Sequence, residues 1–254
     1  MAAPHDRVAG AGATGLTLPD GRAIGHPALL LDLDGTLIDL AATPDAVVVP
    51  HALPPLLRRL RARHADAVAI VTGRPIEAVD ALLGDAPFAV AGEHGAAIRR
   101  GLGQPIERSA LPVLPASALA RAESLAAGFS GALVERKAHG VALHYRQAPA
   151  AMAALREVAV AMVRSCPGFA LLEGSMTWEV RPTGVNKGGA VRALMASQPF
   201  AGRVPIFVGD DVTDQDGIAA AQALGGAGLL VADVFGTPAA VRAWLETSCG
   251  GEHA

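Results

Sequence analysis

Two aspartates lie at the end of an apolar run in the first part of the chain. Residues 28–39 read ALLLDLDGTLID, with Asp32 and Asp34 two positions apart. Alternate side chains of a strand share a face, so this spacing predicts two carboxylates on one side of a strand that Gly35 ends. Acids after a strand often serve only as turn or cap residues. Burying two carboxylates side by side is costly, which favours a chemical role for this pair.

Three further segments carry polar groups where predicted strands end or helices begin. They are Thr72-Gly73-Arg74, Lys187, and the stretch GDDVTD with Asp210, Asp211 and Asp214. Ligands of parallel α/β sheets bind at the carboxyl ends of the strands, so we expect these groups to meet there. Carboxylates gathered in one place repel one another and need a cation. Oxygen ligands suit Mg²⁺, and no Cys or His cluster has zinc spacing.

Lys187 and Thr72 are suited to holding a phosphate. A lysine in the first turn of a helix opposes the helix dipole, and one interpretation is a solvated side chain that tolerates this cost. Beside a phosphate, the ammonium and the helix N–H groups act together. Thr72 can offer its hydroxyl and backbone N–H to the same group, or cap the helix that follows Pro75. With two aspartates, these parts predict phosphoryl transfer, in which one carboxylate attacks and the other moves protons.

The elements around these residues alternate between strands and helices. This order predicts an α/β fold with a parallel sheet and helices on both faces. From 107 to 181 the order changes to helix, two strands, helix, two strands, which indicates an inserted α+β unit. We therefore expect an N-terminal tail at 1–27, a catalytic core made of 28–106 and 182–254, and an inserted cap at 107–181.

The strands of the insertion carry charged side chains at alternate positions. Glu135 with Lys137, and Glu179 with Arg181, each share one face of a strand, and His144 lies on the strand between them. A solvated antiparallel sheet has this pattern. A sheet whose polar face lies over an active site has it too, and both interpretations stay open at this point.

The composition restricts the partners of the protein. The chain has 254 residues, 51% of them hydrophobic, a formal net charge of -3 and two distant cysteines. Without a basic run or a long apolar stretch, we expect no nucleic-acid and no membrane partner. No apolar segment of signal-peptide length starts the chain, which predicts a cytoplasmic location. The sequence leaves the oligomeric state open.

Four motifs together resemble those of the haloacid dehalogenase (HAD) superfamily. They are DLDGTL, VTGR, NKG and GDDVTD, in this order. Over residues 28–246, the stretches AGEHGAAIRR, LVERKAHGVALHYRQAP, WEVRPTGVNKG and RVPIFVGDDVTD are similar to the trehalose-6-phosphate phosphatases of that superfamily. This resemblance implies a Rossmann-like core with a cap that determines the substrate. It also implies Mg²⁺-dependent hydrolysis of trehalose 6-phosphate, a small sugar phosphate, through an aspartyl-phosphate.

The resemblance assigns roles to individual residues. It implies that Asp32 is the nucleophile, that Asp34 is the general acid and base, and that Thr72 and Lys187 hold the phosphoryl group. Mg²⁺ would lie on Asp32, on the backbone carbonyl of Asp34 and on Asp210, with Asp211 and Asp214 in support. Further residues would contact the sugar from the cap or from core loops that face it, namely Lys137, His144, Glu179, Arg181, Arg74, Glu93 and His94.

Some interpretations remain beside this one. Gln215 stands where the family usually has a glutamate, so a charged supporting role at that position is not expected. A phosphatase with the same cap that acts on sucrose 6-phosphate or a mannosyl phosphate would share the core motifs. A phospho-accepting receiver domain would lack Asp34 and the insertion. A catalytically silent regulatory domain would be fused to a synthase.

Overall fold

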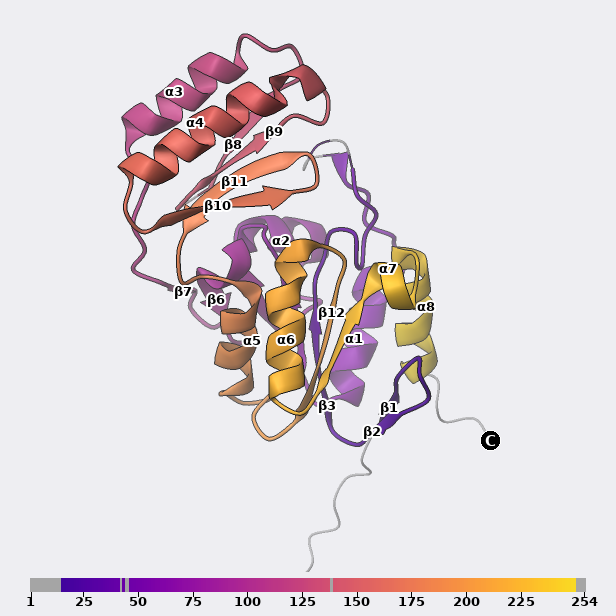
Figure 1. Cartoon of the computed structure of the whole chain (residues 1–254). Coiled ribbons are helices and arrows are strands. Elements are labelled where there is room, and N and C mark those ends of the chain that lie inside the picture. Colours follow the sequence, from indigo (N-terminus) through magenta and orange to yellow (C-terminus); the bar gives the residue numbers. More distant parts are fainter. Residues whose placement is uncertain (1–14, 42, 44–45, 138, 250–254) are drawn as a thin grey trace, which may run out of the picture.

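The protein has two layers built on two separate β-sheets. The computed structural model describes residues 15–41, 43, 46–137 and 139–249. A seven-stranded sheet with helices on both faces forms the larger layer, and a four-stranded sheet covered by two helices lies over one end of it (Figure 1). The larger sheet has the strand order β13-β12-β3-β4-β5-β6-β7.

The larger sheet is parallel in its centre. Its strands are β3 (Pro27–Leu31), β4 (Val68–Val71), β5 (Ala89–Gly92), β6 (Ala97–Arg99), β7 (Glu107–Arg108), β12 (Val204–Gly209) and β13 (Ala227–Leu230). The five strands from β13 to β5 run parallel, and β6 and β7 continue the sheet antiparallel. The predicted α/β class with a parallel sheet is therefore confirmed. Strand β3 lies between β12 and β4, so its carboxyl end is central in the sheet.

Helices cover both faces of this sheet. On one face lie α1 (Leu53–Arg63), α2 (Ile76–Leu83) and α8 (Pro238–Cys249), and on the other α5 (Lys187–Met195) and α6 (Gln215–Ala223). Leu29 and Leu31 of β3 pack toward the first group, and Leu30 packs toward the second. Each is fully buried, which contributes about 1.5–3 kcal/mol per side chain to stability. Within the described residues, no helix is long and apolar enough to cross a bilayer.

The smaller sheet is antiparallel and arises from the inserted segment. Its strands are β8 (Leu133–Arg136), β9 (Val141–His144), β10 (Phe169–Gly174) and β11 (Thr177–Pro182), in the order β10-β11-β9-β8. Helices α3 (Ala116–Ala126) and α4 (Met152–Ser165) cover one face, where Leu143, Trp178 and Val180 are buried. The opposite face is polar and lies toward the larger sheet (Figure 1).

Part of the stretch expected as an N-terminal tail is packed against the core. Strands β1 (Leu16–Thr17) and β2 (Ala23–Ile24) form a short hairpin, and residues 1–14 lie outside the described residues. Leu16 and Leu18 are each 2% exposed and belong to the core cluster of the larger sheet. The Trp244 indole of α8 donates a hydrogen bond to the Thr17 carbonyl oxygen at 2.9 Å. The Gly- and Ala-rich composition did not indicate this packing, because two isolated leucines have no strand or helix period.

His64, directly after α1, makes stability dependent on pH. Its side chain is 1% exposed, and neither ring nitrogen has a hydrogen-bond partner among the described residues. Burial, with the Arg63 and Arg203 charges, lowers the pKa of His64 from 6.5 to about 4. Below pH 6.5 the unfolded chain therefore binds a proton that the folded chain rejects, so acid favours unfolding.

We expect the free energy of unfolding to fall by about 2 kcal/mol through His64 between pH 7.5 and pH 5. Denaturant melts of the wild type and of His64→Leu at both pH values measure this contribution. The variant should lose less stability than the wild type over the same interval. An identical loss in both proteins would show that His64 does not titrate in this way.

Candidate active site

Polar side chains from both layers line one cleft at the carboxyl edge of the larger sheet. Asp32 follows β3, Thr72 follows β4 and Asp210 follows β12, and these three strands are neighbours. The cleft has a volume of about 910 Å³. The predicted site residues that line it are Asp32, Asp34, Thr72, Arg74, His94, Lys137, His144, Glu179, Lys187, Asp210, Asp211 and Asp214.

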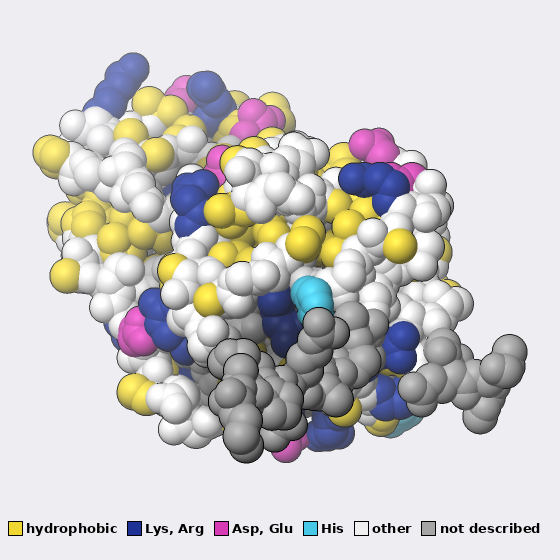
Figure 2. Space-filling model, turned by 90° about the horizontal axis from the view of Figure 1, so that it is seen from below, with side chains coloured by type: hydrophobic (Ala, Val, Ile, Leu, Met, Phe, Trp, Pro, Cys, Tyr) yellow, Lys and Arg dark blue, Asp and Glu magenta, His cyan; other side chains and the backbone are white. Residues whose placement is uncertain are grey.

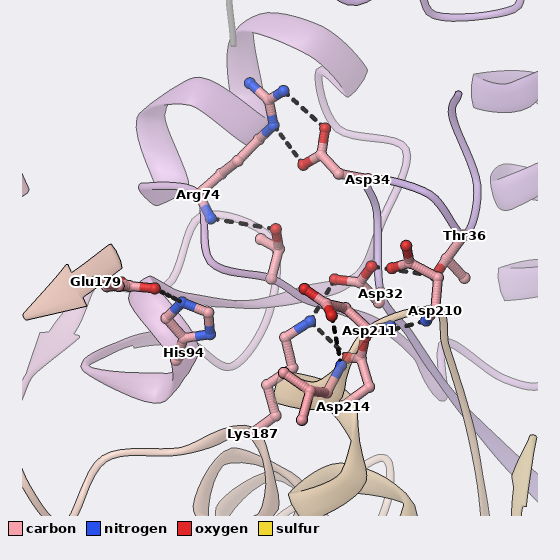
Figure 3. Close-up of polar contacts among 12 residues, drawn as sticks. Asp32, Asp34, Thr36, Arg74, His94, Glu179, Lys187, Asp210, Asp211 and Asp214 are labelled. Atoms are coloured by element: carbon pink, nitrogen blue, oxygen red, sulfur yellow. Dashed lines mark hydrogen bonds and ion pairs between the residues drawn. The ribbon is translucent and has the colours of Figure 1, made fainter. Parts of the chain in front are cut away.

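Asp32 and Asp34 turn in different directions. Strand β3 ends at Leu31, so the two acids lie in the loop after it and do not share a strand face as the spacing predicted. Figure 3 shows Asp32 among the residues of the carboxylate cluster and Asp34 facing Arg74. The Asp34 carboxylate accepts two hydrogen bonds from the Arg74 guanidinium, each 2.7 Å long. In the expected strand the two carboxylates would have pointed to the same side. In the observed loop they point apart and contact different residues.

Lys187 is buried and joins two carboxylates. Its Nζ lies 2.6 Å from Oδ1 of Asp32 and 2.6 Å from Oδ1 of Asp214. Burial opposes the ammonium charge, but the two carboxylates outweigh it and raise the pKa of Lys187. The side chain is 3% exposed, which excludes the solvated-lysine interpretation. The ammonium therefore stays charged beside Asp32.

Asp214 holds the loop that carries the other acids. Its Oδ2 accepts hydrogen bonds from the backbone N–H groups of Asp210 at 3.1 Å and Asp211 at 3.0 Å. Asp211 in turn caps the turn that follows, accepting from the Val212 N–H at 2.6 Å. Asp214 thus joins Lys187 to the backbone of this loop, and Asp211 contributes to its shape.

The arrangement suits a divalent cation. Among the described residues, Asp32, Asp210 and Asp214 each offer an oxygen within 4.8 Å of the others. Three carboxylates and the Lys187 ammonium together leave two negative charges. Burial raises the pKa of Asp32, and burial with the Asp214 charge raises that of Asp210 to about 6. A divalent cation would balance these charges and keep the acids ionised, and Mg²⁺ prefers such oxygen ligands.

Close packing around Asp32 depends on Gly35 and Thr36. A Cβ at Gly35 would lie 2.0 Å from Oδ2 of Asp210, and the glycine has a φ of +74°, which side chains rarely adopt. The Thr36 hydroxyl donates to Oδ2 of Asp32 at 3.1 Å. Sequence reasoning used Gly35 only as a strand breaker and missed Thr36, although both belong to the DLDGTL motif.

Thr72 can donate a hydrogen bond to a ligand from its hydroxyl but not from its backbone N–H. The N–H donates to the Ala91 carbonyl oxygen at 2.9 Å, as part of the sheet. The hydroxyl oxygen accepts from the Arg74 N–H at 3.2 Å and keeps its own hydrogen for another partner. The expectation that both groups would bind phosphate is therefore wrong for the N–H, because the strand pairing of β4 and β5 extends to Thr72.

His94 reaches from a core loop to the smaller sheet. Glu93 and His94 have φ values of +52° and +57°, a conformation that costs non-glycine residues energy and is often found at functional sites. The His94 Nε2 lies 3.4 Å from Oε2 of Glu179. Burial lowers the pKa of His94, with Glu179 opposing this effect. A Cβ at Gly73 would lie 2.8 Å from the His94 ring, so this glycine permits the contact.

Glu179 and Lys137 form a buried ion pair on the smaller sheet. Nζ of Lys137 lies 2.8 Å from Oε1 of Glu179, and the side chains are 13% and 10% exposed. Burial raises the pKa of Glu179, but Lys137 and His94 outweigh it and hold the pKa well below its usual range. Glu179 is thus a carboxylate that faces the core from the second layer.

Two predicted residues lie beside the cleft, and Glu135 and Thr177 are among the unpredicted residues that line it. Glu93 and Arg181 line a smaller cavity that shares His94, Lys137 and Glu179 with the main one. Glu135 and Thr177 line the main cleft on either side of His144. Each lies two residues before a predicted site residue, Lys137 or Glu179, and therefore on the same strand face. This spacing was the sequence signal that could have identified them.

Comparisons with known proteins agree with this geometry. The sequence profile described as trehalose-phosphatase matches residues 30–234. A probable trehalose-phosphate phosphatase of Sinorhizobium fredii is 42% identical over 78% of this chain and 75% of its own length. The trehalose-6-phosphate phosphatase of Escherichia coli K12 is 37% identical over 85% of this chain and 80% of its own length.

A solved structure shares the fold. The C-terminal domain of the Candida albicans trehalose-6-phosphate phosphatase superposes with a TM-score of 0.75, covering 89% of this chain and 93% of that one, at 20% identity. At this identity the likeness concerns the fold alone, whereas the profile match covers most of the chain. The resemblance inferred from the four motifs is confirmed, and the chain belongs to the trehalose-phosphatase family of phosphoric monoester hydrolases.

Proposed function

We propose that this protein hydrolyses trehalose 6-phosphate to trehalose and phosphate, with Mg²⁺, through an aspartyl-phosphate on Asp32. One observation carries the proposal: a single cleft has Asp32 and Lys187 on its core side and a polar sheet face on the other. The core side suits a phosphoryl group and the sheet face suits a polyhydroxylated sugar. The names of the relatives support the substrate.

The proposed domains follow from this division. We propose that the core of residues 28–106 and 182–254 is catalytic and that the inserted segment 107–181 is a cap that recognises the sugar. At its start this division needs a correction, because β7 (Glu107–Arg108) pairs with β6 in the larger sheet and therefore belongs to the core. Lys137 and Glu179 contact the sugar from the cap, and Arg74 and His94 contact it from the core. His144 lines the same cleft and acts through its neighbours, because both of its ring nitrogens are hydrogen-bonded. Glu93 and Arg181, in the adjoining cavity, position these residues.

In the proposed mechanism, a carboxylate oxygen of Asp32 attacks phosphorus and the bond to the sugar oxygen breaks. Protonated Asp34 gives its proton to the departing sugar oxygen. Asp34 then takes a proton from water, whose oxygen attacks the aspartyl-phosphate and restores Asp32. Because Arg74 donates hydrogen bonds to both oxygens of Asp34 in the structure, Asp34 must leave this ion pair and take up a proton from solvent before it can act as the acid.

Lys187 and Thr72 stabilise the charge that spreads over the phosphoryl oxygens, by their ammonium and hydroxyl. Mg²⁺ would be held by Asp32 and Asp210, with the Asp34 carbonyl, and it would further neutralise that charge. Asp211 and Asp214 support the loop that presents Asp210.

Phosphate release from a panel of sugar phosphates tests substrate and metal together. With Mg²⁺ we expect strong release from trehalose 6-phosphate and little from sucrose 6-phosphate or mannose phosphates, and excess chelator should abolish it. Chelator-sensitive release from another sugar phosphate alone would overturn the proposed substrate but would agree with the proposed metal-dependent reaction. Release that is insensitive to chelation would overturn the role of the metal.

Replacement of the nucleophile tests the covalent step. Asp32→Asn should lower kcat by on the order of a thousandfold or more, because the amide cannot form the intermediate. The exposed Asp39→Asn in the same segment is the matched control and should retain activity. Thermal melts establish that both variants fold. Near-normal turnover by Asp32→Asn would exclude it as the nucleophile.

Glu179 tests the recognition of the sugar. Glu179→Gln should lower kcat/KM for trehalose 6-phosphate by about tenfold or more, as expected when a charged hydrogen bond of about 1.5–3 kcal/mol is lost. Turnover of p-nitrophenyl phosphate, which has no sugar, should change little. Glu173→Gln, exposed on β10 of the same sheet, is the control. Equal losses on both substrates would indicate that Glu179 only maintains the structure.

A further inference from the structure

Three polar side chains form a hydrogen-bonded row on the cleft face of the smaller sheet. Oε2 of Glu135 lies 2.8 Å from Nε2 of His144, and Nδ1 of His144 lies 2.9 Å from the Thr177 hydroxyl oxygen. They come from three adjacent strands, β8, β9 and β11, and Thr177 is paired with His144 in the register of the sheet. The row therefore depends on the strand pairing and has a defined order.

The chemistry of the row determines where its hydrogens lie. Hydrogen bonding to His144 is the largest influence on Glu135 and lowers its pKa, so Glu135 is a carboxylate that can only accept. Nε2 of His144 must then carry a hydrogen. When this is the one N–H hydrogen on the ring, Nδ1 has only a lone pair. The Thr177 hydroxyl donates its hydrogen to that lone pair. The oxygen of Thr177 is left with acceptor capacity and no hydrogen to give.

Thr177 presents this acceptor to the substrate cleft. Glu135, His144 and Thr177 all line the cavity that holds Asp32 and Lys187. Thr177 is partly exposed there, and it shares a strand face with Glu179 two residues on. An oxygen that can only accept favours a ligand group that donates, such as a sugar hydroxyl, and disfavours an ether or a halogen at the same place.

We propose that Thr177 is a specificity-determining residue that accepts a hydrogen bond from one hydroxyl of the sugar, and that Glu135 and His144 are positioning residues that impose this direction. The inference rests on the proposed function. It adds which partner donates and which accepts in one hydrogen bond between the protein and the sugar. We assign the hydroxyl to the glucose ring without phosphate, because the proposed function puts the phosphate at Asp32, across the cleft from Thr177.

A double comparison of enzyme and substrate tests the proposal at pH 8. The enzymes are the wild type and Thr177→Val, in which a methyl group replaces the hydroxyl at nearly the same volume. The substrates are trehalose 6-phosphate and its monodeoxyfluoro analogues, fluorinated on the ring without phosphate. Fluorine cannot donate a hydrogen bond. For one analogue the wild type should lose about three- to tenfold in kcat/KM, as expected for one neutral hydrogen bond.

Thr177→Val should show a similar loss on trehalose 6-phosphate and no further loss on that analogue. Thr177→Ser, which keeps the hydroxyl, should behave like the wild type. Turnover of p-nitrophenyl phosphate should be unchanged in every variant. Glu135→Gln, whose amide can donate to His144 and reverse the row, should reduce the discrimination against the fluorinated analogue.

The ¹⁵N chemical shifts of His144 report the positioning directly. We expect an unprotonated Nδ1 and a protonated Nε2 in the wild type, and a change in Glu135→Gln. Equal tolerance of every fluorinated analogue by the wild type would overturn the proposal, as would a protonated Nδ1 or equal losses on p-nitrophenyl phosphate. No wild-type turnover of trehalose 6-phosphate would instead overturn the proposed function, so the two failures are distinguishable.

Discussion

The buried ammonium of Lys187 is the interaction on which the site depends. It contacts Asp32 and Asp214 at 2.6 Å each, and Asp214 binds the backbone that carries Asp210 and Asp211. Removing one partner of such a buried pair leaves an uncompensated charge, which costs about 3–5 kcal/mol. One side chain at the start of α5 thus determines the position of acids from two strands. The same positive charge lies where a transferred phosphoryl group would need it.

Glu179 joins the second layer to the core loop beside this site. The His94–Glu179 contact and the Lys137–Glu179 pair connect a strained core loop to the polar face of the smaller sheet. On the face seen from the far end of the larger sheet, the visible acidic side chains are scattered, and most lie beside Lys or Arg (Figure 2). Between the layers, Asp32, Asp210 and Asp214 instead lie close together in a cleft that both layers line, so a small polar ligand would be surrounded there on both sides.

Much of this arrangement was predictable from local patterns. The alternation of strands and helices predicted the parallel sheet. The positions of Asp32, Thr72, Lys187 and Asp210 in the sequence predicted that these side chains meet at one edge of that sheet. Local patterns did not predict that β3 ends at Leu31 or that the Thr72 N–H donates within the sheet. Both features depend on pairing with neighbouring strands. The contacts of Thr36 and Thr177 also required side-chain positions that only the folded chain defines.

The pairing of β3 with β12 has a consequence for how the chain is made. On one side β3 pairs with β4, which follows it closely, but on the other side it pairs with β12, near the end of the chain. During synthesis the apolar strand β3, which directly precedes the DLDGTL motif, therefore remains an open sheet edge until the last part of the chain emerges. Such edges recruit other strands, so the ribosome-bound chain passes through an aggregation-prone stage after the insertion has been made.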